Sequence, residues 1–330
     1  MSELSLWPIE AQTALKNMMA SNRGQPTFAV FDADNTIWQW DIEEALLAYY
    51  DESQKLNLSS FSLESLPIPP LKDESLYGYY DRLSQIDHSI GYHWAAQIFA
   101  GLRLSELQKD VDTVMSHHSV YHTHTTSPEG TQTISVQSPQ IFPAQKQLIQ
   151  TLQKNNIDVW VISASAEEVV RMVVSHPKYG LNIPPEKVIG VNFLFHTSEG
   201  GVSCGAMERA NGKKGLDYYF SSDRLDATLG RQLFAPATWY GGKLAAIKEW
   251  IHPSQRPILA AGDSTNDQYM LFYADVDHGG CRILIDRGVG QREAYDDLRH
   301  IRSKRQNGAD QNPNSGWIIA TPQALGGADN

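Results

Sequence analysis

Two aspartates stand two positions apart, directly after a short apolar run. They are Asp32 and Asp34 in the sequence FDADNT, and the apolar run is residues 28–31. Two carboxylates at this spacing can divide the work of phosphoryl transfer, because one can attack phosphorus beside a cation while the other protonates the leaving oxygen. An EF-hand calcium loop beginning at Asp32 is the alternative, but its glycine position is occupied by Ile37. The pair therefore favours phosphoryl chemistry over calcium binding.

Two further segments carry groups that suit a phosphate. Ser163 ends the apolar run VWVIS, and the sequence SAEE after it has the spacing of a helix start, where free amides and the helix dipole attract anions. Lys243 follows two glycines at the opening of another helical pattern, where a cation is disfavoured unless an anion lies nearby. Taken alone, each residue has an ordinary interpretation, as a capping serine and a surface lysine.

A fourth segment carries oxygen ligands for a metal ion. The apolar run ILAA leads into GDSTND, where Asp263 comes first and Asp267 lies on the first turn of the next helix. Carboxylates of this kind suit magnesium, although Asp263 could also be a simple helix cap. A nucleophile pair, a hydroxyl, a lysine and metal ligands thus occur in one chain. Their combination predicts a phosphatase-type site.

Apolar runs rich in valine, isoleucine and phenylalanine predict the buried strands that position these groups. The runs are residues 28–31, 159–163, 258–261, 282–285 and, as a possible fifth, 317–320. The helical patterns between them are residues 144–154, 167–175 and 244–251. This alternation predicts an α/β protein with a Rossmann-like, doubly wound parallel sheet, whose ligands bind at the carboxyl ends of the strands.

Residues 41–140 break this alternation. They contain helical patterns separated by the proline-rich LPIPPL, and they end in the polar, turn-rich HTHTTSPEGTQT, which we expect to form a loop. We therefore predict a helical cap domain over residues 41–140 that covers the active site, and a discontinuous α/β core formed by residues 1–40 and 141–330. A second irregular insertion, residues 191–236, opens with a predicted hairpin that turns at residues 199–201.

Composition and charge disfavour several classes of function. The 330 residues include 27 lysines and arginines against 38 aspartates and glutamates, and the formal charge of -11 disfavours binding to nucleic acid or to an anionic membrane. No apolar run is long enough to predict a membrane span. The amino terminus lacks the features of a secretion signal, so the chain as given is expected to be cytoplasmic, or periplasmic if a leader has been removed. Cys204 and Cys281 could form one disulfide or none.

The segments FDADNT, VISAS, GGK and GDSTND resemble the four motifs of the haloacid dehalogenase superfamily, over residues 28–271. The resemblance implies a magnesium-dependent phosphatase that forms an aspartyl-phosphate intermediate, with a helical cap between the first two motifs. It implies that Asp32 is the nucleophile and Asp34 the general acid and base. The implied phosphate ligands are Thr36, Ser163 and Lys243. The implied Mg²⁺ ligands are Asp32, Asp34 through its carbonyl, Asp263 and, in support, Asp267.

Longer stretches resemble one family within this superfamily, the bacterial phosphorylcholine phosphatases. They are FAVFDADNTIWQWDIEEALL, VWVISASAEEVVRMV, KVIGV, PATWYGGKLAAI and RPILAAGD. The resemblance implies a periplasmic enzyme that hydrolyses phosphocholine and binds choline in an aromatic and acidic pocket. The chain departs from the family at Gln85, where an acidic residue is expected, and in the fourth motif, which is one residue shorter.

Aromatic and acidic side chains near the nucleophile and in the cap could hold a quaternary amine, because aromatic faces attract trimethylammonium groups. The candidate residues are Trp38, Trp40, Glu43, Tyr79 and Tyr80. Each aromatic residue could instead pack inside the cap. Glu44 and Asp81 could add negative charge. Four histidines between positions 117 and 124 fit a solvated polar segment better than a zinc or copper site.

Hydrolysis of a small phosphomonoester is the predicted function. Phosphocholine is the first candidate substrate and phosphoserine the runner-up, because the cap is rich in aromatic and acidic residues rather than basic ones. A phosphomutase is disfavoured, since a hydrolase needs only access for water. A non-catalytic binding protein on the same fold is the alternative from another class, but such a protein usually lacks a catalytic residue. The sequence leaves the oligomeric state open.

Overall fold

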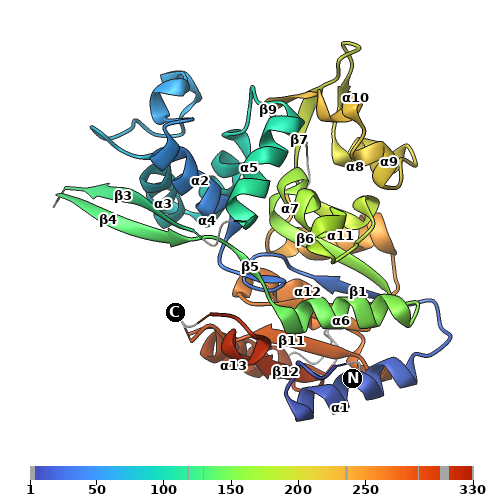
Figure 1. Ribbon diagram of the computed structural model, residues 1–330. Helices are drawn as coiled ribbons and strands as arrows, with labels where there is room; N and C mark the ends of the chain where they lie inside the picture. The colour runs from blue at the N-terminus through green and yellow to red at the C-terminus, as the bar shows by residue number, and fades with distance from the viewer. Residues whose placement is uncertain are drawn as a thin grey trace.

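A mostly parallel β-sheet runs through the protein (Figure 1). The computed structural model describes residues 4–116, 119–128, 130–234, 237–288, 290–304 and 312–328. In spatial order the parallel strands are β12 (Trp317–Ala320), β11 (Cys281–Ile285), β10 (Leu259–Gly262), β1 (Phe28–Phe31), β6 (Asp158–Ala166) and β7 (Val188–His196). Each apolar run in the sequence therefore corresponds to a strand. The predicted doubly wound, Rossmann-like α/β fold is confirmed.

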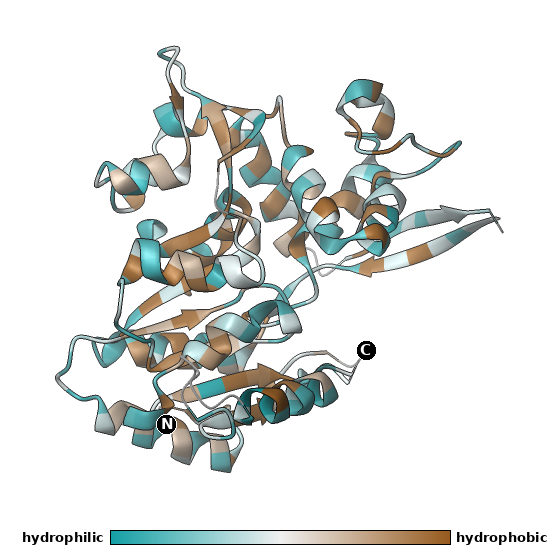
Figure 2. Ribbon diagram, turned by 180° about the vertical axis from the view of Figure 1, so that it is seen from behind, coloured by the Kyte–Doolittle hydropathy of each residue, from teal (hydrophilic) through white to brown (hydrophobic). Residues whose placement is uncertain are grey.

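Helices cover both faces of this sheet, so its strands are buried on each side. Successive residues of β1 point to opposite cores, Ala29 and Phe31 to one and Phe28 and Val30 to the other. The first core includes residues of α1 (Ile9–Ser21), α6 (Pro143–Lys154) and α7 (Glu167–Val174), and it continues into the helices that follow β2 (Trp38–Gln39) and β7. The helices of the second core are α11 (Gly241–Ala246), its π-helical extension Ile247–Ile251, α12 (Gln268–Tyr273) and α13 (Gln291–Ser303). Figure 2 shows the apolar strands between the helices.

A segment between two short strands carries further helices and a hairpin. Strands β2 (Trp38–Gln39) and β5 (Gln140–Ile141) pair antiparallel where the chain leaves and re-enters the core. The helices between them are α2 (Ile42–Ser53), α3 (Leu76–Ile86), α4 (His88–Gln97) and α5 (Leu104–Ser116). The hairpin strands are β3 (Val120–Ser127) and β4 (Gly130–Gln137), which project from the helices (Figure 1). We call residues 42–137 the inserted segment.

The hairpin overturns one prediction. The polar stretch HTHTTSPEGTQT was expected to form a loop, but β3 and β4 pair along their whole length. Threonine and other β-branched residues favour extended backbone. In addition, Tyr121 and Val136 are buried, and β3 packs on α2 and α3. The hairpin is therefore stabilised by tertiary neighbours that the polar sequence does not reveal.

The second insertion begins with the predicted hairpin. Strand β7 turns through residues 197–201 into β8 (Val202–Ser203), which pairs with it antiparallel. The helices that follow are α8 (Gly205–Ala210), α9 (Leu216–Tyr219) and α10 (Ser222–Leu225). They lead to β9 (Thr228–Phe234), which also pairs antiparallel with β7. The short 3₁₀ helices of the chain are Leu58–Ser60, Leu63–Ser65, Pro177–Tyr179, Pro185–Lys187, Thr265–Asp267, Val276–His278 and Gln323–Leu325.

The cysteines and the clustered histidines form no covalent or metal site in the described part of the chain. Cys204 and Cys281 are both buried and unpaired, so no disulfide joins them. His122 and His124 lie on β3, and neither belongs to a group of described residues that could hold a metal ion. The other two histidines of the cluster, His117 and His118, lie outside the described residues. Among the helices that the structure describes, none has the length and apolarity to cross a bilayer.

A cluster of charged side chains is buried beside α7. Arg171 forms ion pairs with Glu167 and Glu168, which lie one helical turn before it. Arg224 lies 2.7 Å from Glu168 and 2.8 Å from Glu208. The side chains of the two arginines and three glutamates are each at most 5% exposed. Their mutual attraction must therefore offset the hydration that each charge loses on burial. The cluster therefore fastens α8 and α10 to α7.

We expect this cluster to make the protein sensitive to acid. Although burial favours the neutral acid, the charges of Arg171 and Arg224 lower the pKa of Glu168 to about 2, from an ordinary value of 4.5. The unfolded chain therefore binds the proton first, so stability that is present above pH 4.5 is lost as the pH falls towards 2. The contribution is roughly 3 kcal/mol. Urea unfolding across this pH range should show a shallower dependence for Glu168→Gln, and an equally steep one would contradict the assignment.

Candidate active site

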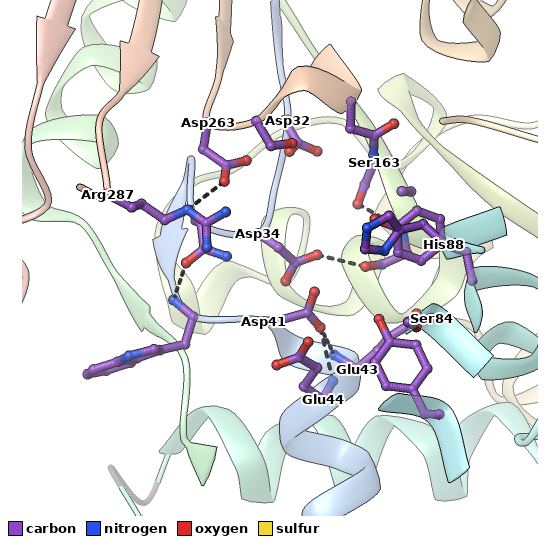
Figure 3. Close-up of a pocket in the computed structure, with 18 of the residues that line it drawn as sticks. Asp32, Asp34, Asp41, Glu43, Glu44, Ser84, His88, Ser163, Asp263 and Arg287 are labelled. Carbon is purple, nitrogen blue, oxygen red and sulfur yellow. Dashed lines mark hydrogen bonds and ion pairs between the residues drawn. The ribbon is translucent and has the colours of Figure 1, made fainter. Parts of the chain in front are cut away.

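The carboxyl ends of three adjacent strands meet at one cavity. Asp32 follows β1, Ser163 lies on β6 and Asp263 follows β10, and β1 lies between the other two strands. The cavity has a volume of about 530 Å³, and residues of the inserted segment line its other side (Figure 3). Groups from distant parts of the sequence are thus brought together at the edge where open α/β sheets bind their ligands.

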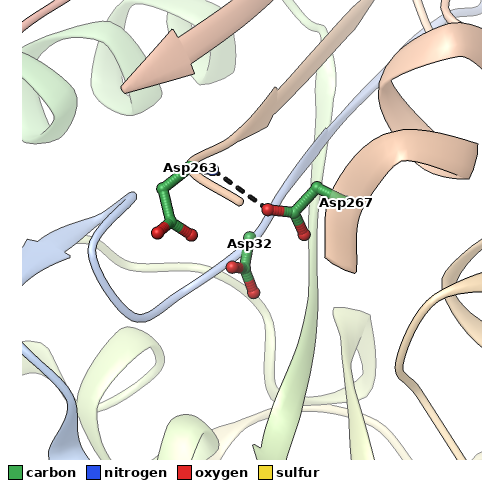
Figure 4. Close-up of side chains that lie close together, drawn as sticks. All are labelled: Asp32, Asp263 and Asp267. Atoms are coloured by element: carbon green, nitrogen blue, oxygen red, sulfur yellow. Dashed lines mark hydrogen bonds between the residues drawn. The ribbon is translucent and has the colours of Figure 1, made fainter. Parts of the chain in front are cut away.

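Three buried aspartates form an acidic cluster at this edge (Figure 4). Carboxylate oxygens of Asp32, Asp263 and Asp267 lie within 4.8 Å of one another. Asp267 is held in place because its Oδ2 accepts hydrogen bonds from the backbone N–H groups of Asp263 and Ser264, at 3.0 and 3.2 Å. Gly262 permits this arrangement, since a Cβ there would lie 2.5 Å from the Asp267 carboxylate. The structure therefore brings together the predicted nucleophile and two predicted metal ligands.

Two cations balance part of this negative charge. Lys243 is fully buried, and its Nζ lies 2.7 Å from Asp32 and 2.6 Å from Asp267. Arg287 lies 2.8 Å from Asp263. Even so, burial and the neighbouring Asp267 raise the pKa of Asp32 to about 7, and burial raises the pKa of Asp263 well above its ordinary range. Clustered carboxylates with incompletely balanced charge fit a hard divalent cation such as Mg²⁺.

Asp34 lines the cavity beside Asp32 and is oriented by three hydrogen bonds. Its Oδ1 accepts from the indole N–H of Trp38 and from the backbone N–H of Ile42, both at 2.8 Å, and its Oδ2 accepts from the Ser165 hydroxyl at 2.7 Å. Burial raises the pKa of Asp34 to about 7 despite these bonds. A carboxyl group with a pKa near neutrality can both donate and accept a proton at physiological pH.

Ser163 and Lys243 lie where they could contact a phosphate attached to Asp32. Thr36 does not line the cavity. Ser163 lines the cavity, and the Nζ of Lys243 reaches the Asp32 carboxylate. Thr36 is fully buried and is not among the residues that line the cavity. The turn after β1 directs its side chain into the protein, where its hydroxyl has no hydrogen-bond partner among the described residues. The cavity lining therefore gives no support to the predicted phosphate contact of Thr36.

The backbone before Lys243 is tightly constrained. A Cβ at Gly242 would come within 1.8 Å of the Ala237 carbonyl oxygen, so this position requires glycine. Tyr240 has a φ of 47°, which is unusual for a bulky residue, and its N–H donates to the Asn266 side chain at 2.6 Å. Asn266 belongs to the segment GDSTND. The loop before Lys243 is therefore fixed against the segment that carries the predicted metal ligands.

The structure brings three of the five residues predicted for a choline pocket to the cavity. They are Trp40, Glu43 and Tyr80. Trp38 is fully buried, and its indole N–H donates a hydrogen bond to Asp34. Tyr79 is also fully buried, and its ring packs on Trp94 with centroids 4.9 Å apart. The structure therefore places Trp38 and Tyr79 away from the cavity. For Tyr79 the reason is that consecutive helix residues, here Tyr79 and Tyr80, point in different directions.

Helix α3 contributes a row of polar and aromatic side chains to the cavity wall. They are Tyr77, Tyr80, Asp81 and Ser84, which share one helix face by their spacing. Glu44 of α2, together with His88 and Tyr92 of α4, also lines this side of the cavity. The three- and four-residue spacing was the signal from which Ser84 could have been predicted. Gln85 lies outside the lining and donates a hydrogen bond to Asp81 at 2.8 Å.

Comparisons with known proteins find one curated relative along nearly the whole chain. The chain is 35% identical to phosphorylcholine phosphatase of Pseudomonas aeruginosa, over 98% of this chain and 93% of the relative. No family model matches the sequence. A conserved protein of unknown function from Anaerococcus prevotii superposes with a TM-score of 0.63 at 16% identity, covering 96% of each chain. A protein of unknown function from Bordetella pertussis has a TM-score of 0.52 at 11% identity, covering 89% and 98% of the two chains. These two structures support the fold alone.

Proposed function

Because this chain belongs to the phosphorylcholine phosphatase family of the haloacid dehalogenase superfamily, we propose that it hydrolyses phosphocholine to choline and phosphate. It is a phosphomonoesterase of the haloacid dehalogenase type. The observation that carries the proposal is a single cavity with catalytic carboxylates at one end and an acidic, aromatic wall at the other. The two ends suit the phosphate and the quaternary amine of one small substrate.

The proposed cofactor is Mg²⁺, held by Asp32, Asp263 and the backbone carbonyl of Asp34, with Asp267 in support. The oxygen-only donor set and the excess negative charge of the cluster support this choice. When bound, the ion would screen the repulsion between the Asp32 carboxylate and the incoming phosphate.

The proposed reaction has two steps, each of which uses both aspartates. In the first, the Asp32 carboxylate attacks phosphorus to form an aspartyl-phosphate, and the bond from phosphorus to the choline oxygen breaks while Asp34 donates its proton to that oxygen. In the second, Asp34 takes a proton from water as the water oxygen attacks phosphorus, which releases phosphate and restores Asp32. Ser163 and Lys243 would hold the phosphate oxygens through both steps.

The cavity wall opposite the strand ends supports a cationic leaving group. Tyr77, Tyr80 and Tyr92 offer aromatic faces, and Glu44 and Asp81 offer negative charge. Among the described residues that line the cavity, Arg287 is the only lysine or arginine, and it pairs with Asp263. A phosphoserine carboxylate would therefore find no lysine or arginine on the wall formed by α2, α3 and α4. We further propose that residues 41–140 act as a cap domain on a core formed by residues 1–40 and 141–330.

Substrate preference tests the proposed function. The purified protein with Mg²⁺ should hydrolyse phosphocholine with a kcat/KM at least about ten-fold above that for phosphoserine, phosphoethanolamine or p-nitrophenyl phosphate, because a trimethylammonium group gains about 1–2 kcal/mol from aromatic and acidic neighbours. Release of inorganic phosphate measures this. If p-nitrophenyl phosphate alone turns over, the catalytic assignment stands and the choline assignment falls.

Replacing Glu44 by glutamine should separate choline binding from chemistry. The KM for phosphocholine should rise by about ten-fold, because the quaternary amine loses a charged partner, whereas kcat/KM for p-nitrophenyl phosphate should change by less than about two-fold. Glu52→Gln on the same helix removes an equal charge from an exposed position and serves as the control. Equal losses on both substrates would show that Glu44 supports the site in general rather than the amine.

A further inference from the structure

Arg287 contacts the acidic cluster but belongs to none of the four motifs. It lies in the loop between β11 and α13, and its Nε is 2.8 Å from Oδ2 of Asp263 (Figure 3). The Asp263 side chain is 5% exposed, whereas the Arg287 side chain is 30% exposed and lines the cavity. An arginine that reaches in from the cavity wall thus pairs with a carboxylate proposed to bind Mg²⁺.

The two cations at the cluster differ in how firmly they are held. Lys243 is fully buried and contacts both Asp32 and Asp267, with a hydrogen bond of 2.6 Å to the latter. By contrast, the Nε of Arg287 meets Asp263 as an ion pair without hydrogen-bond geometry, and it makes no other hydrogen bond within the described ranges. Gly288 and Gly290, which follow Arg287, have φ angles of 72° and 80° that glycine adopts without strain. Arg287 is therefore held in the cluster less firmly than Lys243.

The charge balance of the acidic cluster indicates which ion would replace Arg287. Three carboxylates with Lys243 alone carry a net charge of minus two, which one divalent cation would neutralise. With Arg287 also in place, a divalent cation would give the buried cluster a net charge of plus one. Asp263 would also still be paired with Arg287. We propose that the Arg287 side chain pairs with the Asp263 carboxylate in the absence of metal. A divalent cation that binds the cluster would displace it from Asp263. The inference rests on the proposed Mg²⁺ site.

If Arg287 competes with the metal ion, then removing it should tighten metal binding. Isothermal titration of the substrate-free protein with Mg²⁺ at about pH 8 gives the dissociation constant directly. Arg287→Gln should lower this constant by at least about five-fold, since Mg²⁺ no longer has to break an ion pair. Arg287→Lys keeps the competing charge and should stay within about two-fold of the native protein. Arg292→Gln, an equal charge change at an exposed position of α13, should have no effect.

The direction of the change distinguishes competition from a structural role. Loss of a merely structural arginine would weaken Mg²⁺ binding, so an unchanged or higher dissociation constant in Arg287→Gln overturns the inference and leaves the proposed function intact. If neither the native protein nor the variant binds Mg²⁺, the proposed metal site falls and the inference falls with it. Circular dichroism verifies folding, and Arg287→Met, which keeps the apolar stem, replaces the glutamine variant if that variant does not fold.

Discussion

Replacing Asp32 by asparagine should reduce phosphate release from phosphocholine by at least about ten-thousand-fold. The amide has nearly the same shape as the carboxylate but cannot form the aspartyl-phosphate. The fold should survive, because the change removes one of three clustered carboxylates while Lys243 keeps its contact of 2.6 Å with Asp267. Phosphate release at saturating substrate and Mg²⁺ measures the loss, and circular dichroism verifies the fold.

Trapping the intermediate makes this test specific to the proposed mechanism. Acid quenching of the native protein during turnover should recover phosphate bound to the protein, and the Asp32→Asn variant should yield none. Asp158→Asn removes an equal charge from β6 at a side chain that is 60% exposed, and it should keep full activity. If Asp32→Asn instead retained substantial turnover, a direct attack of water on phosphorus would replace the covalent mechanism. Tight binding of phosphocholine without turnover by the native protein would favour a non-catalytic binding protein.

The sheet could be predicted from the sequence because its strands are buried on both faces. Residues 28–31 form an unbroken apolar run, and the structure has β1 over the same residues. The meeting of Asp32 with Asp263 then follows from topology, since adjacent parallel strands end at one edge. By contrast, the β3–β4 hairpin has a polar sequence, so the prediction of a loop was wrong. Its extended backbone depends on contacts with α2 and α3 that no local pattern reports.

The cavity wall was only partly predictable for a different reason. Residue type indicates that an aromatic side chain can bind an amine, but its direction decides whether it reaches the cavity. Tyr79 and Tyr80 are neighbours on α3, yet only Tyr80 lines the cavity, because consecutive helix residues point about 100° apart. Arg287 could not be predicted at all, since it lies outside every motif and reaches Asp263 only through the fold.

Replacing Arg224 by methionine should lower the free energy of unfolding by about 3–5 kcal/mol. Methionine keeps an unbranched apolar stem but removes the guanidinium, which lies 2.7 Å from Glu168 and 2.8 Å from Glu208. Glu168 would keep only its pairing with Arg171, and Glu208 would keep the hydrogen bond from the Tyr218 hydroxyl. A buried carboxylate without a compensating cation is costly, so the folded state loses stability. Urea unfolding followed by intrinsic fluorescence measures the change.

Two comparisons separate the cost of an unpaired charge from the loss of arginine packing. Arg103→Met removes an arginine whose side chain is 52% exposed and which pairs with Glu106 and Asp226, and it should cost less than about 1 kcal/mol. Adding Glu208→Gln to Arg224→Met should restore roughly 1–2 kcal/mol, because a neutral amide needs no cation. If the double variant were no more stable than Arg224→Met, lost packing rather than an uncompensated carboxylate would explain the effect. The buried cluster would then hold α8 and α10 to α7 mainly through shape rather than charge.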